Sequence, residues 1–402
     1  MLAIVSRAAA AVAAVLAGFV LLAVVDAQAM PGDLIIGGSP NTVFAVTPGT
    51  NTATTVAAVP AGSLRGVMIG PDNTTYYVAA GLSVFEITGG GVVTTLVATL
   101  PFGKGTSWCD LDEDGHLLVS TGWSGSGGVV RVDRATGGIL ATFMPSTFPN
   151  ALCLDRETGD VVVGEISIKT VFRVQRDGTV TTAATLPSPI YAMDYHHLSG
   201  GILICTARDV FHMDALNQVT TFTPGTGYMK AIAVLGDGSV AIGANNNAPI
   251  LHLDRYGASI GTLYNGASLG NSCMVVEDEH NIWSLNIPSP GGTLNLSVHF
   301  AGHPGKPYVA AAALTARPGL PVDSRVIPLN PDNLFMATFV LPQVFVNFTG
   351  VLDAQGHASP HVVIPGQPGL RGLRIYFAAV VLDAAAPSNL AQISQLYGVT
   401  LQ

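Results

Sequence analysis

The stretch GDVVVGEISIKTVFRVQRDG, Gly159–Gly178, contains the pattern that decides the fold of this chain. It holds two short apolar runs, VVV and VFRV, separated by a loop and followed by the turn residues Arg-Asp-Gly. Short runs of β-branched and aromatic residues between Gly, Asp and Asn clusters are typical of β-strands. The stretch therefore predicts two neighbouring strands, the second of which begins near Val171.

The second of these strands recurs along the chain at intervals of roughly forty residues. It reads VFAV, VFEI, VVRV, VFRV, VFHM and ILHL, starting at Val43, Val84, Val129, Val171, Val210 and Ile250. Each copy after the first follows two apolar strands joined by a polar turn, and every copy precedes a looser fourth strand. An interval of this length is typical of propeller blades and not of helical repeats. The chain is therefore predicted to be all-β, with a β-propeller as its first domain.

The number of strand copies predicts six blades. The first strand of the unit occurs six times, beginning with Arg65, and the third strand occurs six times, ending with Ile250. The N-terminal unit, residues 33–58, lacks a first strand, and residues 272–277 are expected to supply it and close the ring. The second strand occurs a seventh time if Ile282–Leu285 is counted, so seven blades are the alternative.

One polar position of the third strand recurs without forming a cluster. Period-2 alternation places one residue of each copy on the same side of its strand. These residues are Ala45, Glu86, Arg131, Arg173, His212 and His252. Equivalent positions in different blades lie far apart around a ring, so a shared catalytic or metal site is not expected there.

Residues 1–29 have the features of a cleavable signal peptide. Arg7 supplies the positive charge, an uncharged apolar run extends from Ala8 to Val25, and Ala27–Ala29 forms an A-x-A cleavage site. Cleavage is expected before Met30. The alternative is an uncleaved anchor, because the apolar run approaches the length of a membrane span. We expect a secreted protein, or one at the cell surface or in the periplasm, with no transmembrane span after cleavage.

The amino-acid composition disfavours some classes of partner and cofactor. The formal net charge of −9 disfavours nucleic acid and anionic membranes. Only 11% of residues are charged, while 46 Gly and 25 Pro suit short strands and tight turns. Cys109, Cys153, Cys205 and Cys273 lack the spacing of a zinc site. Export would permit a Cys109–Cys153 disulfide, but buried thiols are the commoner state.

The repeat, most clearly at Gly159–Gly178, resembles propellers of the NHL, SMP-30 and streptogramin-lyase type. The resemblance implies a funnel-shaped face with an axial pocket, but this fold carries lactonases, lyases and pure binding modules. Lactonase-type members hold a divalent cation in a central cage of carboxylates and amides. Asn150, Glu165 and Asn245 would correspond to that cage, without a second carboxylate. Streptogramin-type lyases use a His and a Glu, and only Glu165 has a matching position here.

Residues 291–402 are expected to form a second domain, after a propeller that spans residues 30–290. The expected strands are Leu294–Phe300, Tyr308–Leu314, Leu334–Val340, Val346–Leu352, Ser359–Ile364, Ile375–Leu382 and Tyr397–Leu401, which predict a β-sandwich. The runs PGKPYVAAA, VIPLNPDNLF, NFTGVLDAQGHA and GLRIYFAAVVLD start at residues 304, 326, 347 and 372. Together they resemble a C-terminal domain common in secreted proteins of planctomycete- and myxobacteria-like organisms. The resemblance implies export, with surface attachment as an alternative to free secretion, and no known catalytic role.

The position of a residue within its blade predicts whether it contacts a ligand. First strands begin, and loops after second strands end, at the face where the blades converge on the axis. The residues expected to contact a ligand there are Arg65, Trp123, Asn150, Glu165, Tyr191, Arg208, Lys230 and Asn245. Ser107, Ser272 and Asn286 occupy equivalent places. This mixture of cations, amides and aromatics suits an anionic or sugar-like ligand, and a polar funnel without a specific ligand is the alternative.

Two further motifs are read as turns. Asp110–Gly115 has the D-x-D-x-D-G start of a calcium loop, but Thr121 stands where the acidic twelfth ligand is needed. Other units have a hairpin turn at this place, so a turn is expected and calcium is the alternative. Tyr195–His197 falls at a comparable turn, at the end opposite the predicted ligand face, and is expected to be solvated.

The expected function is binding or scaffolding outside the cytoplasm, without catalysis and without a cofactor. The partner is expected to be a small molecule, a glycan or a protein. The alternative is an enzyme, either a metal-dependent lactonase or hydrolase or a lyase of the streptogramin type. A tight cage of oxygen ligands on the axis would favour the enzyme, whereas an open funnel of aromatic and amide groups would favour a binding protein.

Overall fold

The computed structural model describes residues 32–38, 41–60, 62–103, 105–122, 127–146, 148–227, 229–244, 249–266, 273–276 and 280–402. The predicted signal peptide, residues 1–29, lies outside this part of the chain. Among the described residues, no helix is long and apolar enough to cross a membrane. The regular secondary structure of the described chain is almost entirely antiparallel strand, as the repeat predicts.

Six four-stranded antiparallel sheets account for the described part of residues 34–276. From inner to outer strand they are β24 (Cys273–Val276), β1 (Leu34–Gly38), β2 (Thr42–Thr47) and β3 (Thr52–Ala58); β4 (Leu64–Ile69), β5 (Tyr76–Ala80), β6 (Ser83–Thr88) and β7 (Val92–Val97); β8 (Thr106–Leu111), β9 (Leu117–Thr121), β10 (Gly127–Val132) and β11 (Ile139–Ser146); β12 (Pro149–Leu154), β13 (Val161–Glu165), β14 (Thr170–Val174) and β15 (Val180–Thr185); β16 (Ile190–Tyr195), β17 (Ile202–Thr206), β18 (Val210–Met213) and β19 (Val219–Thr223); β20 (Met229–Val234), β21 (Val240–Ala244), β22 (Ile250–Leu253) and β23 (Ser259–Tyr264).

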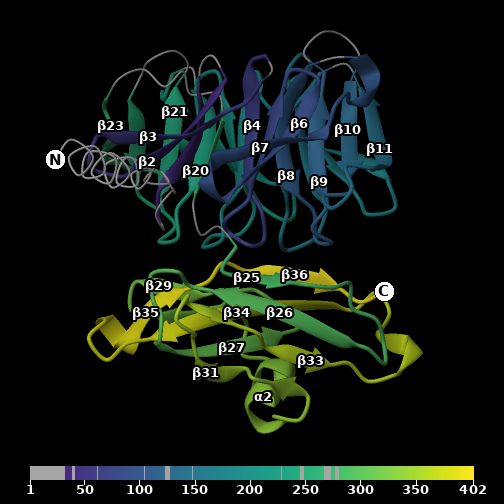
Figure 1. Ribbon diagram of the computed structural model, residues 1–402, viewed down its shortest axis with the longest axis vertical. Helices are drawn as coiled ribbons and strands as arrows, with labels where there is room; N and C mark the ends of the chain where they lie inside the picture. The colour runs from purple at the N-terminus through teal and green to yellow at the C-terminus, as the bar shows by residue number, and fades with distance from the viewer. Residues whose placement is uncertain are drawn as a thin grey trace, which may run out of the picture.

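The inner strands of these sheets form a closed ring. Each of β4, β8, β12, β16 and β20 contacts the next inner strand, and β24 contacts both β20 and β4. Figure 1 shows the resulting propeller from the side, in its upper half. β24 comes from the far end of the repeat region and pairs with β1, with Val276 opposite Leu34. This pairing confirms that residues near 272–277 complete the N-terminal unit.

The recurring polar residue of the third strand secures a turn within its own sheet. Arg131 donates to Asp112, and Arg173 donates to Asp155 at 2.6 Å. In the next two sheets, His252 lies 2.8 Å from the Ser239 hydroxyl, and His212 hydrogen-bonds at the turn that ends at Gly200. The repeated position is therefore structural, as the sequence predicts, because it ties the third strand to the turn between the first two.

Two five-stranded sheets follow the propeller and pack face to face. One sheet contains β25 (Ile282–Ser284), β26 (Thr293–His299), β30 (Phe345–Val346), β32 (His357–Ala358) and β33 (His361–Val363); the other contains β27 (Pro307–Ala313), β31 (Thr349–Val351), β34 (Arg374–Leu382), β35 (Leu390–Ile393) and β36 (Tyr397–Thr400). A hairpin of β28 (Leu320–Val322) and β29 (Arg325–Ile327) and the helix α2 (Asn333–Val340) complete the region. Leu296 of one sheet and Phe377 of the other belong to the same buried cluster. This arrangement is the predicted β-sandwich.

The structure corrects two assignments in this region. Leu334–Val340, predicted as a strand, is the helix α2, because Asp332 caps it by accepting from the backbone N–H groups of Leu334 and Phe335. Ile282–Leu285, the alternative second strand of a seventh blade, instead supplies β25, which pairs with β26. The sandwich sheets therefore begin at Ile282, ahead of the boundary predicted at Gly291.

The sandwich covers one end of the propeller (Figure 1). Its strands lie against the turns that join the first and second strands of the blades, which we call the covered end. Tyr397 donates to the Glu113 carbonyl, and Tyr376 donates to the Glu157 carbonyl at 2.6 Å. The opposite end, where the inner strands begin, points away from the sandwich (Figure 1) and is called the open end.

Candidate functional site

The open end carries one side chain from the start of each of five inner strands. Arg65, Ser107, Asn150, Tyr191 and Lys230 are each the second residue of β4, β8, β12, β16 and β20, respectively. In all five strands the pairing with the second strand shifts register at this residue, as at a β-bulge. Bulges redirect a side chain out of the regular alternation and are common beside binding sites. The repeat thus places five side chains at equivalent positions around the axis.

A recess lies between two of these strands. It has a volume of about 220 Å³ and is lined by Ser107, Gly122, Phe148, Pro149, Asn150 and Ile166. The Asn150 amide donates to the carbonyls of Ile190 and Tyr191, each at 3.1 Å, and so links β12 to the start of β16. The recess therefore has a fixed polar edge beside an aromatic and aliphatic wall.

The predicted ligand residues differ in their exposure. Lys230, Arg65 and Tyr191 are half-buried, while Arg208, in the loop after β17, is exposed. Burial lowers the pKa of Lys230, and the positive charge of Arg65 lowers it further. These two cations flank β24 and act on one another across it. Trp123 and Asn245 lie outside the described residues.

Glu165 is placed differently from the prediction. Its side chain is fully buried. The carboxylate accepts from the Ser167 hydroxyl at 2.8 Å and from the Ile168 backbone N–H at 2.7 Å. These bonds hold the loop between β13 and β14, because a buried carboxylate needs such donors. Glu165 therefore stabilises a loop of the open end and has no exposed surface that a ligand could contact.

The covered end corrects the prediction of a solvated histidine tip. His196 and His197 have relative exposures of 1% and 4%. Arg317 of the sandwich donates to the His197 carbonyl at 3.0 Å and to the Glu157 carboxylate at 2.7 Å. Burial lowers the pKa of His196 to about 4 and that of His197 to about 3. The sequence contains no signal for this burial, because the covering residues come from a distant part of the chain.

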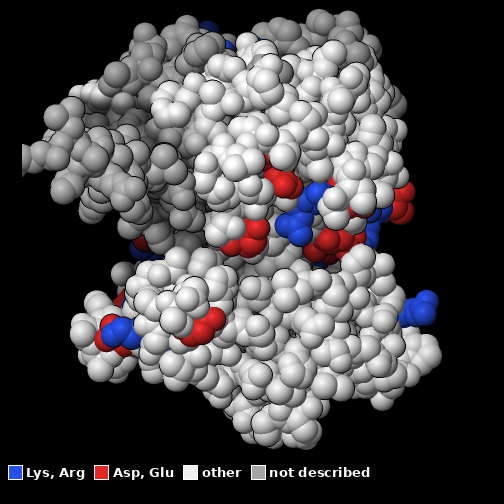
Figure 2. Space-filling view, viewed as in Figure 1, with Lys and Arg blue, Asp and Glu red and all other residues white. Residues whose placement is uncertain are grey.

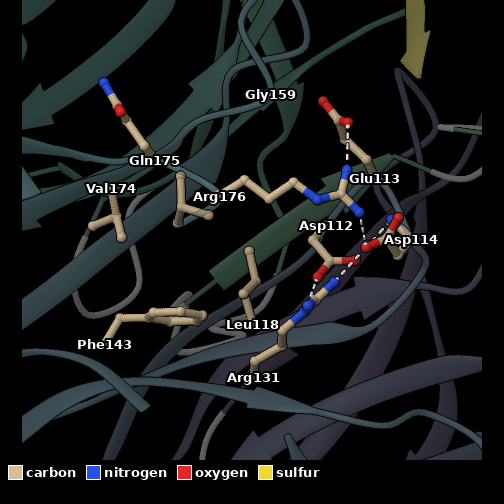
Figure 3. Close-up of a pocket in the computed structure, with 11 residues that line it drawn as sticks. Asp112, Glu113, Asp114, Leu118, Arg131, Phe143, Gly159, Val174, Gln175 and Arg176 are labelled. Carbon is tan, nitrogen blue, oxygen red and sulfur yellow. Dashed lines mark hydrogen bonds and ion pairs between the residues drawn. The ribbon is translucent and has the colours of Figure 1, made fainter. Parts of the chain in front are cut away.

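The acidic loop Asp112–Asp114 at the same end is neutralised by arginines. Figure 3 shows Arg176 reaching Glu113 and Asp114, and Arg131 reaching Asp112 and Asp114. Arg374 of the sandwich also pairs with Glu113. Burial raises the pKa of Glu113, and Arg374 opposes that shift. Charged groups gather along the line between sandwich and propeller in Figure 2, so this loop belongs to the junction.

The metal and cysteine predictions can be compared with the described residues. Asp112 accepts from the backbone N–H groups of Asp114 and His116 at 2.9 Å, which is the geometry of the predicted turn. Within the described ranges, no group of three or more His, Cys, Asp or Glu side chains is arranged to hold a metal ion. Cys109, Cys153 and Cys205 are buried thiols.

Solved structures with a similar fold support the propeller. A protein of unknown function from Bacteroides caccae has a TM-score of 0.50 and 15% identity, covering 62% of this chain and 100% of its own. A chain of the nidogen/laminin complex has a TM-score of 0.53 and 12% identity, covering 61% of this chain and 98% of its own. At these identities the likeness concerns the fold alone.

Structural neighbours also include streptogramin B lyases and a gluconolactonase-like protein. A catalytically inactive virginiamycin B lyase from Staphylococcus aureus, solved with quinupristin, has a TM-score of 0.45 and 13% identity, covering 66% of this chain and 91% of its own. No family model matches the chain, and no curated protein matches it. The resemblance of residues 291–402 to a domain of secreted proteins stays a prediction.

Proposed function

We propose that this protein is exported and binds a ligand, without transforming it, at the open end of its propeller. The observation that carries the proposal is the ring of five bulged side chains at the open end, of which Ser107 and Asn150 line the recess between β8 and β12. The sandwich occupies the other end of the ring with hydrogen bonds and ion pairs. The open end is therefore the end from which we expect a ligand to approach.

Binding is favoured over catalysis by the side chains at the open end. All ten histidines of the sequence are within the described residues, and none of them lies in the loops or strand ends of the open end. The carboxylates described there are Glu165, which is buried, and Asp209, which accepts from the Gly225 backbone N–H at 2.8 Å. General acid–base chemistry most often uses a histidine or a carboxylate that can reach the substrate. The described open end offers hydrogen-bonding and cationic groups instead.

A thermal-shift screen of glycans and small molecules tests this proposal. A ligand that binds only the folded protein stabilises it by about 2.7 kcal/mol when present at about one hundred times its Kd. Each compound that raises the melting temperature is then titrated against Ile166→Trp and Ile168→Trp. Ile166 lines the recess, whereas Ile168 lies in the same loop with 55% of its surface exposed and does not line it.

The expected result is that Ile166→Trp weakens binding at least about tenfold, which is about 1.4 kcal/mol, whereas Ile168→Trp leaves it unchanged. Equal binding to both variants and to the original protein would refute the recess as the site. Chemical conversion of a bound compound, monitored by chromatography over hours, would support the lyase or lactonase alternative instead.

A further inference from the structure

The open end has the opposite charge balance from the protein as a whole. The loops and inner-strand starts at this end, as far as they are described, carry Arg65, Lys169, Arg208 and Lys230 against Glu165 and Asp209. The undescribed residues between 61 and 272 contain one lysine and no carboxylate. The open end is therefore cationic, although the formal net charge of the chain is −9.

The carboxylates are concentrated at the covered end. The turns between first and second strands and between third and fourth strands contain Asp72, Asp112, Glu113, Asp114, Asp133, Asp155, Glu157, Asp160, Asp177, Asp214, Asp237 and Asp254. Arg131, Arg176, Arg317 and Arg374 pair with several of them at or near the junction. Since this acidic charge lies at the far end of the strands and is partly neutralised there, it opposes the cations of the open end only weakly.

Two of the cations are close to the axis. Lys230 and Arg65 start inner strands on either side of β24, and the Arg65 charge acts on Lys230. Both side chains are half-buried, so water screens their repulsion less than it would on an open surface. Like charges that lie close together and are partly shielded from water raise the local concentration of anions. An anion seated between them relieves the repulsion and accepts charge-assisted hydrogen bonds.

We propose that the ligand of the open end carries a compact anionic group, a carboxylate or a phosphate, which Lys230 and Arg65 hold at the mouth of the ring. This inference rests on the proposed function and specifies the ligand class of the same site. Tyr191, which neighbours Lys230 around the ring, and Asn150 and Ser107 at the recess supply neutral hydrogen-bonding groups for the rest of the molecule. The volume of the recess, about 220 Å³, suits a small molecule or one end of a larger one.

Calorimetric titration with three probes tests the proposal. The probes are citrate for carboxylates, inorganic phosphate for phosphates, and glucose as a neutral control, each at low and at high NaCl. The full chain is compared with Lys230→Met, Arg65→Gln and Lys169→Met. Lys169 lies in a loop of the same end, away from the inner strands, where its ammonium group donates to the Pro187 carbonyl at 3.3 Å. Its replacement removes the same formal charge without altering the axial pair.

The expected result is that citrate or phosphate binds the original protein and that NaCl weakens this binding. Lys230→Met and Arg65→Gln should each weaken it at least tenfold, and Lys169→Met less than twofold. Two independent axial variants are used so that a folding defect in one leaves the other informative, and a melting curve of each verifies its fold. Equal weakening by all three variants would mean a diffuse cationic surface and would overturn the proposal, as would anion binding that no axial variant changes.

The proposed function and this inference fail in different ways. If the original protein binds neither citrate nor phosphate, but a neutral compound from the screen binds and Ile166→Trp abolishes that binding, the anionic class is wrong and the binding function stands. If no compound and no anion binds, both are wrong.

Discussion

Acidification is expected to destabilise this protein through the histidines of the junction. His196, His197 and His299 are buried, and burial lowers their pKa values to about 4, 3 and 4. In the unfolded chain a histidine has a pKa of about 6.5. At these three histidines the unfolded chain therefore binds about 1.5 more protons than the folded protein at pH 6.5, and nearly three more at pH 5. Stability due to these groups is present above pH 6.5 and is lost as the pH falls.

Asp194 acts in the opposite direction. Burial raises its pKa to about 7, so the folded protein takes up a proton on acidification before the unfolded chain does. Because the unfolded histidines are only half protonated at pH 6.5, the balance averages about 1.5 protons, and at about 1.4 kcal/mol per proton and pH unit the loss from pH 6.5 to pH 5 is about 3 kcal/mol. His280, whose pKa is also lowered by burial, adds to this loss, and Asp110, whose pKa is raised by burial, reduces it.

Urea denaturation at several pH values between 7 and 5 measures this loss. His197→Asn should remove the contribution of one proton, so that its stability depends less steeply on pH. The matched control is His303→Asn, since His303 lies in the sandwich, where its backbone N–H donates to Phe300, and not among the buried junction histidines. Stability that stays constant or rises as the pH falls from 6.5 to 5 would refute the assignment of these histidines as buried and neutral.

Four further outcomes are expected. Arg374→Met should destabilise the protein by about 3 kcal/mol, because it leaves the buried Glu113 without one of its partners. Lys306→Met, at the more exposed pair with Asp383, should destabilise it by less than about 1 kcal/mol, and denaturation curves compare the two variants. Cys153 and Cys205 should react with a thiol reagent only after unfolding, because burial raises both pKa values, and rapid reaction of the native protein would contradict their burial. N-terminal sequencing of exported protein should begin at Met30, and a sequence that still contains Leu21 would indicate an anchor. Limited proteolysis should cut between β25 and β26, where Leu285 and Ile287 are exposed, and a first cut within β26 would contradict a boundary between the two domains there.

The repeat predicted the propeller because each blade needs buried apolar residues at the same strand positions. Val129, Val171 and Val210 are fully buried at equivalent strand positions, and only apolar β-branched residues suit such places. The same register identified Arg65 and Lys230 as neighbours of the axis. Local period and turn residues thus predicted the sheets and the placement of the inner-strand residues at the open end.

Other features depend on contacts between distant parts of the chain. The strand predicted at Leu334–Val340 has an apolar pattern that suits a strand or a buried helix, and the Asp332 cap favours the helix. His196 and His197 were predicted to be solvated because their turn is polar, but the sandwich, which begins at Ile282, covers that turn. Glu165 was predicted from its strand position, but its burial depends on the bonds of the loop that follows.

Hydrogen exchange measured with and without ligand tests most directly whether the open end is the binding site. The measurement uses the full chain with citrate, or with the compound that stabilises it most in the screen. Slower exchange is expected in residues 105–107, 148–150, 189–191 and 229–231, where the inner strands begin, with no change in the turns 112–116 and 196–201. Protection confined to those turns or to the sandwich would contradict the account.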